Sequence, residues 1–189
     1  MKDLFYDKLR MREGISQKFP IASLKERQSE ENLLSCRLLD TYLLSKKNVF
    51  LGYRALNDEV DLCLFYKKMI EKGQIVCFPK VEKHEMCFYR CFDYEDSCFW
   101  QKNLSYGMLE PFPDESRSID PKQISVAMVP GRAFDQSNGR LGRGKGFYDK
   151  FFRKYPHIFK VGIGFSFQMI EKVPMSCDDQ FMNRVEICL

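Results

Sequence analysis

Three segments decide the fold: Val49-Phe50-Leu51-Gly52-Tyr53, Asp58-Glu59-Val60-Asp61 and Gln74-Ile75-Val76-Cys77-Phe78-Pro79. The first and third are short apolar runs with β-branched and aromatic residues, which predicts buried strands over 49–53 and 74–79. The acidic segment 58–61 precedes a run with helical spacing, and acids favour the first turn of a helix because the helix dipole is positive there. We therefore expect a helix that opens at this acidic segment.

Leu62, Phe65 and Met69 place apolar side chains on one face of that helix, and Gly73 marks its end. A strand, a helix and a second strand within about 30 residues form a βαβ unit, whose strands are parallel and joined by a right-handed crossover. The pattern therefore predicts the α/β class, with a mostly parallel central sheet.

The remaining elements follow the same periodicities. We expect helices over 24–46 (from a capping box of Ser23 and Glu26) and around Phe147, Phe151 and Phe152, strands over 85–92 (in a hairpin), 124–130 and 160–165, and a loop over 106–111.

The composition fits a single domain over 1–189, because 189 residues with 44% hydrophobic content can bury a substantial core. No apolar run reaches the roughly 18 residues of a membrane-spanning helix, and acids early in the chain argue against a secretory signal. The eight cysteines form no C-x-x-C pair and there are only two histidines, so we expect reduced cysteines in a cytoplasmic protein rather than a zinc site. A net charge of +4 does not by itself imply a nucleic-acid partner.

Between 129 and 149 the chain is rich in glycine and in cations. Glycine lets backbone N–H groups approach a ligand closely, and four cations with one intervening acid, Asp135, favour an anionic ligand such as a phosphate chain. Asp135 itself is expected to shape the loop. The glycines and cations of the segment are Gly131, Arg132, Gly139, Arg140, Gly142, Arg143, Gly144, Lys145 and Gly146.

The spacing from Gly139 to Lys145 matches a P-loop, but Gly146 stands where a P-loop needs Ser or Thr to hold Mg²⁺. Another residue must then provide a metal ligand, and Asp149, just inside the following helix, is the first candidate. The alternative interpretation is a solvated, flexible basic loop without a ligand.

Parallel strands bring their carboxyl ends to one edge of a sheet, where ligands bind in open α/β folds. Glu59 follows the carboxyl end of strand 49–53, and the glycine-rich loop follows that of strand 124–130. The acid and the loop should therefore lie on the same rim.

The segments Pro130-Gly131-x-Ala133-Phe134-Asp135 and Arg140-Leu141-Gly142-x-Gly144-x-Gly146-x-Tyr148-Asp149 resemble the signature of the 5-formyltetrahydrofolate cyclo-ligase family, also called 5,10-methenyltetrahydrofolate synthetases. Weaker similarities occur in the family order at 8–12, 23–27, 58–61 and 110–111. The resemblance implies a three-layer Rossmann-like fold with helices on both faces of the sheet. It also implies an ATP-dependent enzyme that closes 5-formyltetrahydrofolate to 5,10-methenyltetrahydrofolate, with Mg²⁺ as cofactor and ATP as co-substrate.

The resemblance assigns roles to the site residues. Arg143 and Lys145 would be catalytic, Glu59 and Arg54 would bind the folate, and Asp149 and then Asp179 would hold Mg²⁺. The residues implied for ATP are Lys8, Arg12, Arg140, Leu141, Gly142, Arg143, Gly144, Lys145, Gly146, Phe147 and Tyr148, and the folate would also contact Arg143, Gly144, Lys145, Gly146 and Phe147.

Two departures from the family pattern stand out. Phe147 replaces the first of two tyrosines, and Asn183-Arg184-Val185-Glu186 replaces the usual acidic ending. Two other functions remain open: a different ATP- or phosphate-dependent α/β enzyme, or a non-catalytic folate- or nucleotide-binding protein that uses the same loop. We expect a monomer with the small-molecule substrates 5-formyltetrahydrofolate and ATP, and with no nucleic-acid or membrane partner.

Overall fold

A computed structural model describes residues 2–18, 24–42, 48–82, 85–105 and 107–188. The helices are α1 (Lys2–Lys18), α2 (Leu24–Tyr42), α3 (Cys63–Glu71) and α4 (Phe147–Lys154), with short 3-10 turns η1 (Glu115–Arg117), η2 (Pro121–Gln123) and η3 (Ser166–Gln168). The strands are β1 (Val49–Leu51), β2 (Ile75–Glu82), β3 (Glu85–Cys91), β4 (Trp100–Lys102), β5 (Leu109–Pro111), β6 (Ile124–Pro130), β7 (Ala133–Phe134), β8 (Arg140–Leu141), β9 (Phe159–Phe165) and β10 (Arg184–Cys188).

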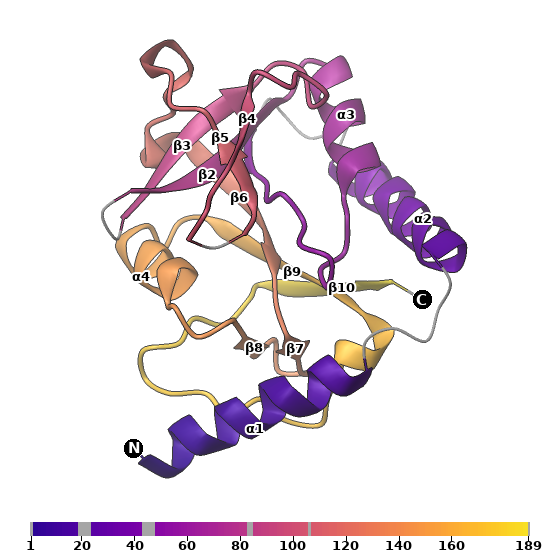
Figure 1. Ribbon diagram of the computed structural model, residues 1–189, viewed down its shortest axis with the longest axis vertical. Helices are drawn as coiled ribbons and strands as arrows, with labels where there is room; N and C mark the ends of the chain where they lie inside the picture. Colours follow the sequence, from indigo (N-terminus) through magenta and orange to yellow (C-terminus); the bar gives the residue numbers. More distant parts are fainter. Residues whose placement is uncertain (1, 19–23, 43–47, 83–84, 106, 189) are drawn as a thin grey trace.

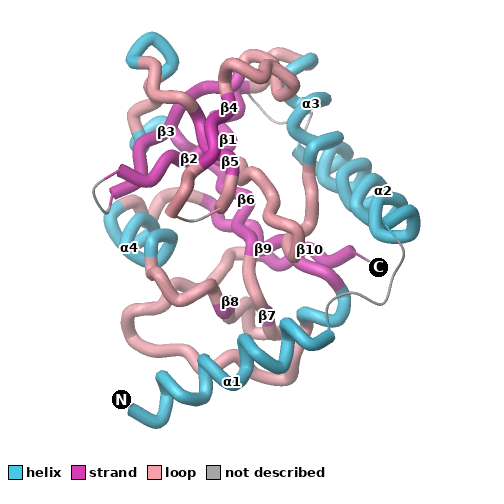
Figure 2. Tube along the Cα trace, viewed as in Figure 1, coloured by secondary structure: helices cyan, strands magenta, loops and turns pink. Residues whose placement is uncertain are grey.

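The central sheet has six strands in the order β10-β9-β6-β1-β2-β3. Every neighbouring pair is parallel except the β2–β3 hairpin, which is antiparallel. Figure 2 shows these strands crossing the molecule, while β4–β5 and β7–β8 form two small separate ladders. The predicted α/β class and mostly parallel sheet are therefore confirmed.

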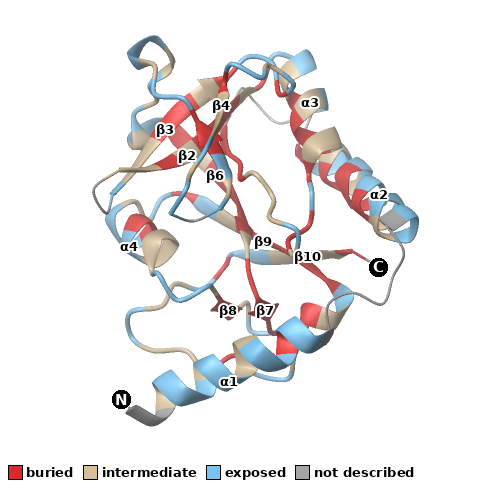
Figure 3. Ribbon diagram, viewed as in Figure 1, coloured by how far each residue is buried: buried red, intermediate tan, exposed pale blue. Residues whose placement is uncertain are grey.

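Helices cover both faces of the sheet. Successive strand residues point to opposite sides, so each face offers apolar side chains for a helix to pack against. On one face, Phe50 and Phe78 pack with residues of α2 and α3 in the larger core cluster. On the other face, Leu51 and Cys77 pack in a second cluster with Phe152 of α4. In Figure 1 α2 and α3 lie on one side of the sheet, α4 on the other, and α1 runs across one end. Figure 3 shows the buried strands between these helices.

The acidic segment does not begin a helix, contrary to expectation. α3 starts at Cys63, and its first turn contains no acid. Asp58 and Glu59 instead lie in a turn, where the Glu59 carboxylate accepts a hydrogen bond from the backbone N–H of Leu56 at 3.0 Å. Asp61 accepts one from the N–H of Cys63 at 2.9 Å, just before the helix. Glu59 and Asp61 therefore accept hydrogen bonds from the backbone of a loop, and neither lies in the first turn of a helix.

Other boundaries differ in smaller ways. The predicted loop 106–111 contains β5, which pairs antiparallel with β4 and places Pro111 opposite Trp100. Helix α2 is described up to Tyr42, so the end of the predicted helix and Ser23 of its capping box lie outside the described residues. Helix α1 and strand β10 were not predicted. Within the described ranges, no helix is both long and apolar enough to span a membrane.

Candidate active site

A cavity of about 440 Å³ opens at the carboxyl-end rim of the sheet. One side is formed by α1 and the loop between β8 and α4, and the other by β2 and the β4–β5 ladder. All residues predicted for the site line this one cavity: Lys8, Arg12, Arg54, Glu59, Arg140, Leu141, Gly142, Arg143, Gly144, Lys145, Gly146, Phe147, Tyr148, Asp149 and Asp179. Their placement is observed, while their individual roles stay predictions.

The glycine-rich loop turns sharply before it enters α4. Gly144 has φ +94° and Gly146 has φ +68°, in the left-handed region that residues with a Cβ rarely adopt. Gly146 is the residue immediately before α4, so the turn aims the amino end of that helix at the cavity. Backbone N–H groups at such an end favour an anion.

Asp135 holds the base of the loop and takes no part in the cavity wall. Its carboxylate accepts hydrogen bonds from the backbone N–H groups of Ser137 (2.9 Å), Gly139 (2.8 Å) and Val173 (2.8 Å). The side chain is buried. These contacts are those of a residue that shapes the loop, as expected.

Helix α1 brings two cations to the loop. The Arg12 Nε donates to the carbonyl of Gly142 at 2.8 Å, and Lys8 forms an ion pair with Asp179. Burial lowers the pKa of the Arg12 guanidinium, and Asp179 opposes that shift. Burial alone would raise the pKa of Asp179, but hydrogen bonds from Lys8 and Ser176 lower it below the usual value. The site is therefore ionic on this side.

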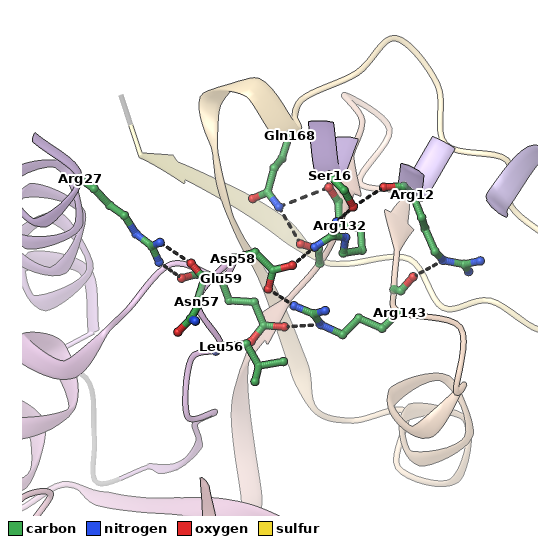
Figure 4. Close-up of polar contacts among 12 residues, drawn as sticks. Arg12, Ser16, Arg27, Leu56, Asn57, Asp58, Glu59, Arg132, Arg143 and Gln168 are labelled. Carbon is green, nitrogen blue, oxygen red and sulfur yellow. Dashed lines mark hydrogen bonds and ion pairs between the residues drawn. The ribbon is translucent and has the colours of Figure 1, made fainter. Parts of the chain in front are cut away.

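The acidic turn meets the loop directly. Arg143 Nε lies 2.9 Å from Glu59 Oε1, and the same guanidinium pairs with Asp58. Asp58 also pairs with Arg132, whose buried side chain reaches Ser16 of α1. Burial acts to lower the pKa of Arg143, yet Glu59 and Asp58 raise it above the usual value. Figure 4 shows Arg143 reaching across to both carboxylates.

A residue from α2 fixes the backbone of the acidic turn. The Arg27 guanidinium donates to the carbonyl of Glu59 at 2.5 Å and also to that of Asn57. Its Nε bonds to Glu31 at 3.0 Å, and Glu31 in turn accepts from the N–H of Asp61 at 2.9 Å. Figure 4 shows Arg27 approaching Glu59 from the side opposite to Arg143. Sequence reasoning missed this role because α2 lies far away along the chain.

The two predicted metal ligands, Asp149 and Asp179, both line the cavity, and the backbone next to Asp179 contacts Asp149. The backbone N–H of Gln180, next to Asp179, donates to the Asp149 carboxylate at 3.1 Å. Arg140 Nη2 lies 3.3 Å from the other oxygen of Asp149. Mg²⁺ is commonly held by one or two carboxylates together with phosphate oxygens, so this donor set fits it. In the described ranges there is no cluster of three or more acidic, His or Cys side chains that could hold a metal by itself.

The other wall of the cavity is apolar, and sequence reasoning missed most of it. The Arg54 guanidinium lies over the rings of Tyr94 (4.5 Å) and Trp100 (5.0 Å). A buried ion pair between Lys80 and Glu110, at 2.5 Å, ties β5 to β2. The apolar residues of this wall that were not predicted are Phe78, Pro79, Val81, Met86, Trp100, Met108 and Leu109. The side chains of this wall come from β2, β3 and the β4–β5 ladder, which pack together in the fold. Four further apolar residues also line the cavity: Phe5 on α1, Tyr53 and Leu56 between β1 and the acidic turn, and Pro130 at the end of β6.

A cationic glycine loop thus faces a carboxylate and an apolar wall at the carboxyl-end rim of a parallel sheet, which is where ligands bind in open α/β enzymes. The sequence profile of the 5-formyltetrahydrofolate cyclo-ligase family matches residues 6–187. The chain therefore belongs to this family, and it is a ligase.

Individual relatives agree with that assignment. A Schizosaccharomyces pombe protein named "Probable 5-formyltetrahydrofolate cyclo-ligase" is 34% identical over 152 residues, which is 72% of each chain. The 5-formyltetrahydrofolate cyclo-ligase of Mus musculus is 24% identical and covers 93% of this chain and 90% of its own. The solved structure of Aquifex aeolicus 5,10-methenyltetrahydrofolate synthetase has a TM-score of 0.79 at 27% identity, with 95% of this chain and 89% of that chain covered.

Proposed function

We propose that this enzyme converts 5-formyltetrahydrofolate into 5,10-methenyltetrahydrofolate at the expense of ATP, with ADP and phosphate as the other products. One observation carries the proposal beyond family membership: Arg143 of the glycine-rich loop lies 2.9 Å from Glu59 of the acidic turn. A reaction between a nucleotide and a folate needs its two binding regions in contact, and this pair provides that contact.

The chemistry takes place in two steps. The formyl oxygen on N5 attacks the γ-phosphorus of ATP, the bond from that phosphorus to the ADP oxygen breaks, and ADP leaves. N10 then attacks the activated formyl carbon and loses its proton, while the carbon–oxygen bond breaks. Phosphate leaves with the former formyl oxygen, and the five-membered ring is closed. Phosphoryl transfer of this kind depends on positioning and charge neutralisation more than on covalent catalysis by the protein.

The residues of the cavity suit these demands. We assign Glu59 to the N–H donors of the pterin ring, because its carboxylate is an acceptor at the boundary of the apolar wall. Arg143 and Lys145 would stabilise charge on the transferred phosphoryl group. Lys8 and Arg12 would bind the remaining phosphates from α1, beside the turning backbone of Gly144.

Asp149 and Asp179 would hold Mg²⁺ together with phosphate oxygens. When bound, the ion would neutralise phosphate charge. Arg140, 3.3 Å from Asp149, orients that carboxylate toward the cavity that it lines. When ATP and the ion bind, Lys8 would leave its ion pair with Asp179 and contact a phosphate instead.

The product gives a direct test of the function. Its methenyl group produces an absorbance band that the substrate lacks, so the pure protein with 5-formyltetrahydrofolate, Mg²⁺ and ATP should generate this band and equal amounts of ADP and phosphate. Substrate labelled with ¹⁸O in the formyl group should transfer the label to phosphate. Unlabelled phosphate would contradict the two-step route, and ATP binding without product would indicate a different ATP-dependent enzyme.

We also propose that the protein works as a cytoplasmic monomer. The eight cysteines are free thiols, which is typical of a reducing compartment. Size-exclusion chromatography with light scattering and cell fractionation test both statements; a dimer mass or a membrane-enclosed location would contradict them.

A further inference from the structure

We infer that Phe5 stacks on the base of the nucleotide, a part of ATP that the residues assigned to the phosphates do not reach. The inference rests on the proposed function and deepens it. Phe5, Lys8 and Arg12 line the same cavity. They are three and four residues apart on α1, so they lie on one face of the helix.

The carboxyl end of α1 lies near the acidic turn that we assign to the folate, and the amino end lies away from it. Ser16 contacts Arg132, which pairs with Asp58 beside Glu59. One turn earlier, Arg12 bonds to the loop carbonyl of Gly142. The helix therefore begins far from the acidic turn and approaches it toward its carboxyl end.

The next turns continue in the same direction. Lys8 pairs with Asp179, and Phe5 follows at the outer end of the cavity-facing residues. At 1.5 Å per residue, Phe5 is about 10 Å along the helix axis from Arg12. Because the γ-phosphate must meet the folate beside Glu59 and Arg143, the phosphate chain points outward along Lys8 and Arg12. The base then reaches the level of Phe5.

Exposure distinguishes Phe5 from a packing residue. Phe5 is 62% exposed, although it lies in the wall of the cavity. Its ring meets that of Tyr6 edge to face at 5.8 Å, and Tyr6 is 57% exposed but does not line the cavity. An exposed ring at a cavity rim is suited to a planar ligand, since every base offers a π-face to an aromatic side chain.

The folate is the competing ligand for this ring. The apolar wall that would contact the folate lies on β2 and the β4–β5 ladder, where Phe78, Trp100 and Leu109 line the cavity. Phe5 is on α1 with the phosphate-binding cations, which favours the nucleotide. Stacking is tolerant of base identity, so Phe5 would support GTP as well as ATP.

The test compares ATP with a ligand that has the phosphates and no base. Isothermal titration calorimetry would measure the binding of ATP and of inorganic tripolyphosphate to the intact protein and to Phe5→Ala, Phe5→Trp and Tyr6→Ala. Phe5→Ala should weaken ATP on the order of ten-fold and leave tripolyphosphate within about two-fold. Phe5→Trp should retain ATP affinity, and Tyr6→Ala is the matched control, because it removes an equally exposed ring from the same helix.

Two results would overturn the inference. Equal weakening of ATP and tripolyphosphate by Phe5→Ala would mean that the substitution displaces α1 and its cations. Unchanged ATP binding with a raised KM for folate would assign the ring to the other substrate. Since calorimetry does not require turnover, the result stays separate from the cyclisation assay, whose failure would refute the proposed function instead.

Discussion

Arg143 Nε and Glu59 Oε1 lie 2.9 Å apart, although 84 residues separate them in the chain. One belongs to the loop after β8 and the other to the turn after β1. Parallel pairing of β1 with β6 brings both segments to the same rim. The contact therefore joins the glycine-rich loop, which we assign to the phosphates, to the turn that we assign to folate.

Glu59→Gln should raise the KM for 5-formyltetrahydrofolate by roughly 10- to 100-fold, because hydrogen bonds to a charged group contribute about 1.5–3 kcal/mol. ATP affinity should change little, since Lys8 and Arg12 remain. Steady-state kinetics with each substrate varied would measure both. Glu186→Gln is a matched control: Glu186 is similarly buried and pairs with Arg37 at 2.9 Å, outside the cavity. Equal losses for both substrates would contradict the assignment of Glu59.

Lys145→Ala should lower kcat on the order of 10² or more, because the ammonium group is proposed to act on the phosphoryl group in the transition state. The side chain is exposed, and it forms no ion pair with any residue that the structure describes. Its removal should therefore leave the thermal unfolding midpoint unchanged. Lys150→Ala, an exposed lysine on α4 outside the cavity, is the control. Near-normal kcat in Lys145→Ala would rule out the catalytic role.

Asp149→Asn should raise the Mg²⁺ concentration for half-maximal activity by at least roughly ten-fold, because an amide is a weaker ligand than a carboxylate. Electron paramagnetic resonance with Mn²⁺ and ATP would detect the lost binding without turnover. Asp178→Asn is the control, because Asp178 pairs with Arg153 at the surface. If both variants bound Mn²⁺ equally well, Asp149 would not be a metal ligand.

Arg27→Lys should raise the KM for folate by roughly ten-fold, because lysine cannot donate to the carbonyls of Asn57 and Glu59 and to Glu31 together. Arg37→Lys is the matched control on the same helix, since Arg37 bonds to Glu186 and to the carbonyl of Ile187. The two variants should lose similar thermal stability. A positioning role for Arg27 fails if the KM for folate rises equally in both.

Much of the fold could be predicted from the sequence because its strands are continuous apolar runs. Strands 49–53, 74–79, 124–130 and 160–165 correspond to β1, β2, β6 and β9. Their parallel order also gave the shared rim of Glu59 and the glycine loop. β10 was not predicted because it lies at the edge of the sheet, where Arg184 and Glu186 interrupt the apolar pattern.

The error at the acidic segment has a physical cause. Acids before an apolar helical run resemble a first turn, but Glu59 and Asp58 bind an arginine that is distant in the sequence. The apolar wall and the clamp by Arg27 were also unpredictable, because each depends on tertiary contacts between elements far apart in the chain. Local periodicity contains no information about such contacts.

A double-mutant cycle across Glu59 and Arg143 tests the central claim, that these residues join two substrate sites into one. The measurement is kcat/KM for 5-formyltetrahydrofolate at saturating ATP, in Glu59→Gln, Arg143→Lys and the double variant. Residues in contact couple by about 0.5–3 kcal/mol, so the double variant should lose less activity than the product of the two single losses. Losses that multiply within error would contradict a shared site.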